Sequence, residues 1–512
     1  MTTVVRRPVL KARRRLAALA VLLLSATTLM AGGQSAAALA SVTVDASVRL
    51  WGLRTEMDTQ IKYPLQLDRA PGTRARLDAF GAPRVRINAT ADGCCWPGGP
   101  APMIPAGLVE GSWDFSSLDS VISDITATRA ETVLNIFHAP EWMWDCTTRA
   151  IRDLTFAEFA DYMARLVSYY NKGSFVAEDG RTITNPAGVT NRITYWELWN
   201  EPDLMSIACP DRAPNITAAQ YVTMWNATTA KMSAVDPSVK FLGPATDAPE
   251  YVTALIAGAA RRPDALSFHG YGGWLVEQSD QFLFDGLGGI VNSLLRMRAW
   301  GIPVWVTELN VTAAATDDPT HRPYNAYGAA WGASAFRLLA LAGATTIFQY
   351  EFAHPNNPIF QLVDPVTGTP RLPYWRDYYL ARYFPPGSRL LFATSSLSGV
   401  ETLAVRAPDS SNVRVLVVNR QVDSPAAVGG PGMPATVQVR VRNLRGIAQV
   451  TLRQFDDATP LESGPPATAL PTSSTATVTF SGYGAAILEF VTTTLGSDGD
   501  GDHGLPSGLD GQ

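Results

Sequence analysis

The chain has 512 residues, a net charge of −5 and 17% charged side chains. This length exceeds one ordinary domain and accommodates a barrel of about 250 residues or more with a smaller module beside it. No basic cluster follows the N-terminal segment, which excludes nucleic acid as an electrostatic partner and favours a neutral or weakly charged one.

The N-terminal segment, residues 1–40, predicts an export signal peptide. Basic residues between Arg6 and Arg15 precede an apolar run, and Ala38-Leu39-Ala40 supplies the small residues of a cleavage site. An uncleaved membrane anchor is the alternative, but the apolar core is short for a span of about 20 residues. We expect cleavage after Ala40 and a secreted, extracellular protein with no membrane segment after signal removal.

Residues 41–385 alternate short β-branched runs with longer helical patterns, which predicts βα units around a parallel sheet. The expected fold class is α/β, a (β/α)8 TIM barrel. In such a barrel the chemistry lies at the carboxyl ends of the strands, so the residues that end each run are the candidates for function. The eight candidate strands lie near Trp51, Arg86, Val133, Tyr195, Phe241, Ser267, Val304 and Ile347.

Residues 386–495 predict a smaller all-β domain, an antiparallel β-sandwich. Beyond Phe384 the pattern changes to short alternating runs separated by Gly, Pro and Ser. Residues 41–50 also alternate apolar with polar side chains, which suggests that they add a strand to that sandwich. The tail, residues 496–512, is expected to be disordered, because its Asp-Gly repeat lacks the Glu that completes a calcium loop.

The chain has four cysteines, Cys94, Cys95, Cys146 and Cys209. In an exported protein they predict disulfides, since the adjacent pair lacks the ligand spacing of a zinc site. We expect at least one bridge from Cys94 or Cys95 to Cys146 or Cys209, tying together the loops after strands two, three and four. Four cysteines allow three pairings, and the sequence does not choose between them.

Two glutamates end the fourth and seventh candidate strands. Glu201 closes the run Trp-Glu-Leu-Trp-Asn-Glu-Pro, and Glu308 lies in Val-Trp-Val-Thr-Glu-Leu-Asn. Cleaving a glycosidic bond with retention requires one carboxylic acid and one carboxylate held about 5 Å apart, which two strand ends of one barrel can supply. Glu197, which lies inside the fourth strand among apolar neighbours, is interpreted as a buried, hydrogen-bonded barrel carboxylate.

On these motifs the chain resembles glycoside hydrolase clan A, whose members place an Asn-Glu-Pro acid/base after strand four and a nucleophilic Glu after strand seven. The resemblance covers residues 51–384 and is greatest to family 39, while families 5, 30, 51 and 79 stay possible. It implies a retaining glycoside hydrolase with Glu201 as acid/base, Glu308 as nucleophile, a carbohydrate substrate, and no cofactor or metal.

The same resemblance suggests roles for further residues. Asn200 would donate to the sugar 2-hydroxyl, Tyr271 would hold the nucleophile, and His269 would contact the substrate or the acid/base. Arg86 would keep the nucleophile ionised. The alternatives are a core His and Tyr for the pair on strand six and a structural barrel salt bridge for Arg86.

Three more residues are candidates for substrate binding. His138 ends strand three, Trp142 follows it as a possible sugar platform, and Tyr350 ends strand eight, where the clan often places an aromatic floor under the sugar. The Trp that is common at that position in the clan is absent from Gln349-Tyr350-Glu351-Phe352.

Three other functions compete with hydrolysis as explanations of these motifs. A non-catalytic carbohydrate-binding protein is disfavoured because both carboxylates are retained. A metal-assisted barrel hydrolase is disfavoured because no His-x-His spacing appears at the strand ends. A transglycosylase would use the same residues as a hydrolase, so the sequence does not separate the two. The sequence also leaves open the sugar, the linkage and the oligomeric state.

Overall fold

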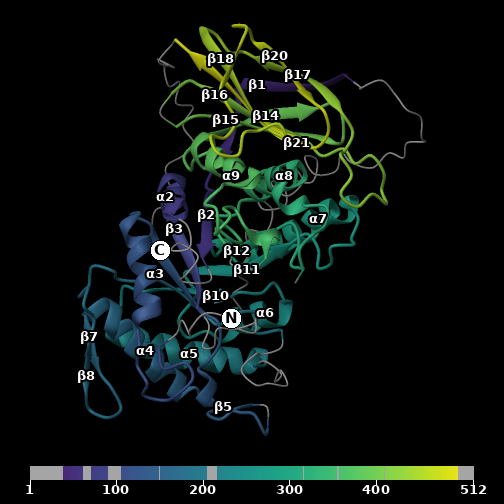
Figure 1. The fold of residues 1–512 in the computed structure, drawn as a ribbon. Coiled ribbons are helices and arrows are strands. Elements are labelled where there is room, and N and C mark those ends of the chain that lie inside the picture. Colours follow the sequence, from purple (N-terminus) through teal and green to yellow (C-terminus); the bar gives the residue numbers. More distant parts are fainter. Residues whose placement is uncertain are drawn as a thin grey trace, which may run out of the picture.

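Eight parallel strands of the computed structural model close a barrel, and a nine-stranded sheet lies against one side of it (Figure 1). This architecture confirms the predicted (β/α)8 barrel followed by a smaller all-β domain. The described residues are 39–61, 71–89, 105–148, 150–204, 216–314, 316–354, 357–408 and 410–493. Most of the predicted signal peptide and all of the predicted tail lie outside these ranges, so both stay predictions.

Strands and helices alternate along the barrel. The barrel strands are β2 (Glu56–Ile61), β3 (Arg84–Ala89), β4 (Glu131–Ile136), β9 (Tyr195–Leu198), β10 (Lys240–Pro244), β11 (Ala265–Tyr271), β12 (Val304–Asn310) and β13 (Thr346–Gln349). The helices that follow them are α2 (Pro71–Phe80), α3 (Ser116–Ala127), α4 (Ala157–Lys172), α5 (Ala218–Val235), α6 (Pro249–Gly258), α7 (Asp280–Arg298), α8 (Ala326–Ala342) and α9 (Leu372–Tyr383). The connections contain the hairpins β5 (Trp144–Asp145) with β6 (Ala150–Ile151) and β7 (Ser174–Val176) with β8 (Thr182–Thr184), and the short 3-10 turns η2 (Glu141–Met143), η3 (Arg322–Tyr324) and η4 (Pro358–Phe360).

Local sequence explains where several helices begin and end. Thr217 and Gln220 form a reciprocal capping box at the start of α5. Asn325 caps the first turn of α8, and Gly343 ends that helix at a φ of 83°, which a residue without a Cβ adopts at little cost. Helix α8 is rich in alanine and buried along most of its length, because it is packed between the barrel and the second domain (Figure 1).

The barrel interior has an apolar half, which also holds the ion pairs of Arg84 with Glu56 and Asp58, and a polar half. Toward the amino ends of the strands it is filled by Val133, Leu242, Ala265, Trp305 and Phe348, with Tyr195 packed against them. Toward the carboxyl ends it is polar. The predicted catalytic residues lie in the polar half, at the carboxyl ends of the strands, as expected for a barrel of this kind.

The second domain consists of a single nine-stranded sheet, and the buried side chains of its strands form one apolar core. Its strand order is β19-β18-β21-β16-β15-β14-β1-β17-β20. Alternate residues of β17 are buried, so one face of that strand meets the core and the other faces solvent. The strands are β1 (Leu39–Gly52), β14 (Arg389–Ser395), β15 (Val400–Arg406), β16 (Val413–Asn419), β17 (Ala435–Arg442), β18 (Ile447–Phe455), β19 (Thr468–Leu470), β20 (Thr475–Phe480) and β21 (Gly484–Thr492).

The structure differs from the sequence-based expectation in three details. The first barrel strand begins at Glu56 instead of near Trp51, because residues up to Gly52 belong to β1. Strand β1 carries residues 41–50 and pairs parallel with β17, so the second domain is not wholly antiparallel. Strands β14 and β19 have no clear signal in the sequence: β19 is three residues long, and β14 begins two residues after Gly387.

Asp280 joins the two domains at the start of α7. Its carboxylate is fully buried and accepts hydrogen bonds from Arg322 at 3.1 Å, from the backbone N–H groups of Gly429 and Gly430 at 2.8 and 3.0 Å, and from the Tyr483 hydroxyl at 3.2 Å. A buried charge of this kind is tolerated because it is paired and hydrogen-bonded. The contact fixes the position of α7 beside β11.

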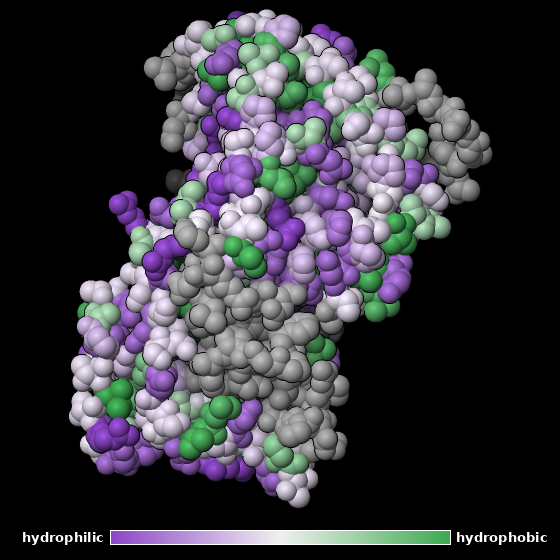
Figure 2. Space-filling model, viewed as in Figure 1, coloured by the Kyte–Doolittle hydropathy of each residue, from purple (hydrophilic) through white to green (hydrophobic). Residues whose placement is uncertain are grey.

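The described surface carries no broad apolar area on the face shown in Figure 2, where hydrophobic residues are scattered among polar ones. Among the described residues, none of the helices combines the length and apolar character that crossing a membrane requires. Of the four cysteines only Cys146 lies in the described ranges, and it is not a free thiol. The predicted bridge and its pairing involve Cys94, Cys95 and Cys209, which lie outside those ranges, so that prediction remains untested.

Candidate active site

A β-bulge directs Glu308 into the barrel. Trp305 faces the interior, so regular alternation along β12 would also point Thr307 inward and Glu308 outward. The pairing with β11 instead skips Thr307, since Phe268 lies opposite Val306 and His269 lies opposite Glu308. An extra residue of this kind reverses the alternation beyond it. Glu308 therefore shares the interior face of the barrel with His269.

Four side chains from three strands hold the carboxylate of Glu308. Its Oε1 accepts from Arg86 Nη1 at 2.7 Å and from Asn88 Nδ2 at 3.3 Å, with Gln60 Nε2 at the limit of 3.5 Å. Its Oε2 accepts from the Tyr271 hydroxyl at 2.5 Å. These donors fix the orientation of a carboxylate that is only 5% exposed.

Arg86 is the centre of the polar half of the barrel. Its guanidinium is fully buried and donates to Glu197 at 2.6 Å, to Gln60 Oε1 at 2.6 Å, to Asn200 Oδ1 at 2.9 Å and to Glu308. The planar fork of an arginine suits several acceptors at fixed angles. Glu197 lies in a fully buried ion pair with this arginine, as a barrel carboxylate.

The backbone after β9 turns sharply to present Asn200 and Glu201. Trp199 has a φ of 72° and Glu201 a φ of 42°, both in the left-handed region that costs most residues energy. The Trp199 ring packs outward against Phe159 at a centroid distance of 5.6 Å. Asn200 consequently points into the barrel toward Arg86, and Glu201 reaches the other side of the same opening.

Glu201 and Glu308 lie on either side of His269. His269 Nδ1 is 2.7 Å from Glu201 Oε1 and 3.5 Å from Glu308 Oε2. One oxygen of each carboxylate and one nitrogen of His269 all lie within 4.8 Å of one another. This separation of the carboxylates agrees with the spacing of about 5 Å in retaining glycosidases and is shorter than the roughly 6.5–9.5 Å of inverting ones.

The same three residues form the one group within the described part of the chain whose spacing would suit a metal ion. Their ligand atoms are already engaged in hydrogen bonds, and the Arg86 guanidinium at 2.7 Å from Glu308 would repel a divalent cation. The residues present therefore suit a carboxylate pair better than a cation site.

The surroundings set the charge of the two buried groups. Burial raises the pKa of Glu308, but the positive charges of His269 and Arg86 and the hydrogen bond from Tyr271 lower it by more, to well below its ordinary value. Burial lowers the pKa of His269, but the carboxylates of Glu308 and Glu201 raise it by more, so it ends above its ordinary value. Glu308 is thus held as a carboxylate, and the pKa of the neighbouring His269 lies above its ordinary value.

Tyr350 lies beside Tyr271 at this opening. The two rings meet edge to face at a centroid distance of 6.2 Å, and Phe360 packs against Tyr350 at 4.9 Å. The peptide bond between Tyr350 and Glu351 is cis. An aromatic side chain thus occupies the end of β13, where the resemblance placed an aromatic floor.

His138 and Trp142 each place a ring nitrogen near a backbone carbonyl oxygen. The Trp142 indole N–H donates to the Ala106 carbonyl at 2.8 Å, and the Arg152 guanidinium lies 5.0 Å from its ring centre. His138 is 2% exposed, with Nδ1 2.7 Å from the Ala139 carbonyl. The ring of Trp142 is therefore occupied by protein on at least one side, which weakens its case as a sugar platform.

Gln60 and Asn88 contact Glu308 but were not among the predicted residues. The signal for Asn88 was available, because it lies two residues beyond Arg86 and side chains at that spacing face the same way along a strand. Gln60 was missed because the first barrel strand was placed six residues too early, near Trp51 instead of Met57.

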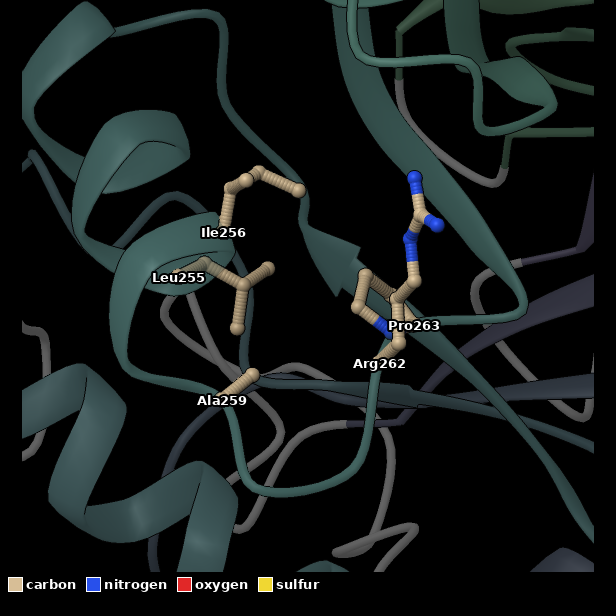
Figure 3. Close-up of a pocket in the computed structure, with 5 residues that line it drawn as sticks. All are labelled: Leu255, Ile256, Ala259, Arg262 and Pro263. Carbon is tan, nitrogen blue, oxygen red and sulfur yellow. The ribbon is translucent and has the colours of Figure 1, made fainter. Parts of the chain in front are cut away.

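A cavity of about 260 Å³ opens beside Glu201, between the ends of β9, β10 and β11 and the first half of α7. Another, of about 290 Å³, lies between α6 and the loop that leads into β11, with Leu255 and Ile256 facing Arg262 and Pro263 across it (Figure 3). The second cavity borders the amino end of β11, at the opposite end of the barrel from Glu201. Of these two cavities, only the one beside Glu201 lies next to the paired carboxylates.

No protein-family model and no curated protein matches the sequence. Among solved structures the chain resembles a monomeric β-xylosidase from Caulobacter crescentus CB15, with a TM-score of 0.61 and 16% identity over 89% of this chain and 100% of that one. It also resembles a family 39 β-xylosidase from Caulobacter crescentus (TM-score 0.57, 16% identity, 88% and 99% covered). An α-L-arabinofuranosidase from Thermotoga maritima is similar as well (TM-score 0.59, 14% identity, 88% and 99% covered). These likenesses confirm the fold, a (β/α)8 barrel with an all-β domain, that the sequence predicted.

Proposed function

We propose that the protein is a retaining glycoside hydrolase that cleaves O-glycosidic bonds of an oligosaccharide or polysaccharide. The observation that carries the proposal is the pairing of Glu201 and Glu308, with oxygens within 4.8 Å and different surroundings. Glu308 is held ionised by Arg86 and Tyr271, whereas Glu201 contacts His269 and borders an open cavity. Two carboxyl groups in unlike environments can act as nucleophile and acid.

The geometry supports a double displacement. In the first step Glu308 attacks the anomeric carbon while Glu201 gives its proton to the departing oxygen, so the glycosidic bond breaks as a glycosyl-enzyme ester forms. In the second step Glu201 takes a proton from water, which attacks the anomeric carbon and releases Glu308 as a carboxylate. Because Asn200 Oδ1 accepts from Arg86, its amide N–H groups remain to donate to a sugar hydroxyl.

The substrate class and location belong to the same proposal. The solved structures named above are those of a xylosidase and an arabinofuranosidase, which act on carbohydrates. A predicted signal peptide at residues 1–40 adds secretion to the proposal. A secreted glycosidase would meet polysaccharides outside the cell.

The first experiment is hydrolysis of a panel of aryl glycosides and polysaccharides by the protein from Ser41, with Glu308→Gln, Glu201→Gln and a control, Glu131→Gln, at an exposed residue at the amino end of β4. We expect Glu308→Gln to lower kcat by at least about 10⁴-fold, as loss of a catalytic nucleophile does elsewhere. Glu201→Gln should be rescued by azide, with an azido sugar as product. NMR of the first-formed product should show retained anomeric configuration.

Other outcomes point to the rival functions. Sugar binding without turnover on the whole panel would identify a carbohydrate-binding protein. Products longer than the substrate, formed at low acceptor concentration, would identify a transglycosylase. Turnover unaffected by Glu308→Gln would overturn the assignment of the nucleophile.

A further inference from the structure

The cavity beside Glu201 borders the proposed acid/base and not the nucleophile. Its lining includes Glu201, His269 and Tyr271, but neither Glu308 nor Arg86 nor Asn200. The sugar that forms the covalent intermediate must sit over Glu308, and the leaving oxygen must face Glu201. A cavity that begins at Glu201 and extends away from Glu308 therefore lies on the side of the departing group.

We propose that this cavity is a leaving-group subsite that selects a neutral sugar and rejects a uronic acid. The inference rests on the proposed function, since a leaving group exists only if a glycosidic bond is cleaved. Three features of the lining carry it, namely its charge, its aromatic wall and its floor.

The charge of the lining is negative. Besides Glu201 it contains the carboxylates of Asp203 and Asp247, and none of the described residues that line it is Lys or Arg, although Arg296 pairs with Asp247 at 3.3 Å from outside the lining. Its one group able to carry positive charge, His269, has Nδ1 at 2.7 Å from Glu201. Sugar hydroxyls can donate to carboxylates, whereas the carboxylate of a uronic acid would be repelled by them.

The wall of the cavity is Trp274, in the loop between β11 and α7. Its side chain is 60% exposed, although a large aromatic residue is ordinarily buried. Its ring lies 6.1 Å from that of Tyr271, which itself donates to Glu308. An exposed indole beside an acidic lining offers a flat apolar face for the C–H side of a sugar, with hydroxyl acceptors opposite it.

The floor of the cavity is open because α7 carries glycine there. A Cβ at Gly286 would meet the Gly272 carbonyl oxygen, so close packing of α7 against that loop explains this glycine. A Cβ at Gly289 would meet no atom within 4 Å, although Gly289 lines the cavity. Packing therefore does not require glycine at 289, which is exposed, and a side chain there would stand on the lining of the cavity.

Gly289 gives a test with a matched control. Gly288 is also in α7, is exposed, has open space at its Cβ and does not line the cavity. Both Gly289→Leu and Gly288→Leu should preserve the helix, because leucine favours helix more than glycine does. The measurement is kcat/KM for a disaccharide substrate divided by kcat/KM for the matching glycosyl fluoride, whose leaving group is one atom.

We expect Gly289→Leu to lower this ratio at least about tenfold and Gly288→Leu to leave it at the wild-type value, a difference of about 1.4 kcal/mol. Trp274→Ala should lower the ratio in the same direction. Equal ratios in wild type and Gly289→Leu, with both substrates hydrolysed, would overturn the subsite and leave the proposed function intact. If the wild type hydrolysed neither the disaccharide nor the glycosyl fluoride, both the subsite and the proposed function would be overturned.

Selection by charge is tested with acceptors that intercept the glycosyl-enzyme. Methyl β-D-glucoside and its glucuronate counterpart are compared as acceptors, and transfer products are quantified against hydrolysis. We expect the neutral acceptor to be used at least about tenfold more efficiently, and Asp203→Asn with Asp247→Asn to narrow the difference. Equal use of the two acceptors by the wild type would overturn the charge selection.

Discussion

Two arginines on one strand, the partly buried Arg84 and the fully buried Arg86, each pair with two acids, but the pKa of a neighbouring carboxylate is raised beside one and lowered beside the other. Arg84 and Arg86 are two residues apart on β3 and face the same interior. Arg84 contacts Glu56 and Asp58 in the apolar half of the barrel, and Arg86 contacts Glu197 and Glu308 in the polar half.

The carboxylates beside these arginines titrate in opposite directions. Burial raises the pKa of Asp58 to about 7, although Arg84 opposes the change. The pKa of Glu308 is lowered, because His269 and Tyr271 add to the effect of Arg86. One arginine beside two acids is therefore not enough to keep a buried carboxylate ionised, and the extra donors at the carboxyl ends of the strands decide the outcome.

The largest expected effect separates the two arginines by function. Arg86→Lys should lower kcat/KM on the order of 1,000-fold, because a lysine cannot hold Glu308, Asn200 and Glu197 together. Arg84→Lys should lower the melting temperature without a comparable loss of kcat/KM. Steady-state kinetics and thermal unfolding of both variants test this, and equal kinetic losses would show that both halves of the barrel serve catalysis.

A smaller effect is expected from the hydroxyl of Tyr271. Tyr271→Phe removes the donor at 2.5 Å from Glu308, so the ionised form is less stabilised and its pKa rises. The acid limb of kcat/KM should move to higher pH by about one unit, with a loss of activity of about 100-fold at the optimum. Tyr195→Phe, in the apolar half of the barrel, serves as control. An acid limb at the wild-type position in Tyr271→Phe would contradict the holding role.

The third effect concerns stability instead of activity. In the folded chain Asp58 keeps its proton up to about pH 7, whereas its ordinary pKa is 3.8, so the folded state binds an extra proton between these values. The free energy of unfolding of the wild type therefore falls as pH rises through this window. Asp58→Asn lacks this proton, and its stability relative to wild type should rise by about 3.5 kcal/mol from pH 4 to pH 7.5. Urea unfolding at the two pH values measures the difference. An unchanged difference would mean that Arg84 keeps Asp58 ionised in the folded chain.

Much of the barrel was accessible from local pattern. Seven of the eight strands were located by their β-branched runs, and Arg86, Asn200, Glu201, His269, Tyr271 and Glu308 lie together in the structure, as do Tyr350 and Tyr271. The first strand was misplaced because residues 50–52 and residues 56–61 form two strands of different sheets in quick succession. The alternation of polar and apolar residues along a strand does not show which sheet that strand joins.

Other features of the site depend on contacts far apart in the sequence. Trp142 follows strand three as the pattern suggested, yet its indole is bound by Ala106 and covered by Arg152. The Gln60 contact with Glu308 joins residues 248 positions apart. A motif of a few residues contains no information about contacts between residues that are so far apart in the sequence.

The sequence by itself determined that the chain forms a βα barrel with a β domain, and that two glutamates end strands four and seven, because periodicity and short motifs are local properties. It did not determine that Glu308 faces inward. Alternation from Trp305 would have pointed Glu308 outward, and only the bulge at Thr307, set by the register with β11, turns it toward Arg86. Register is a relation between two strands, so the tertiary structure alone decided it.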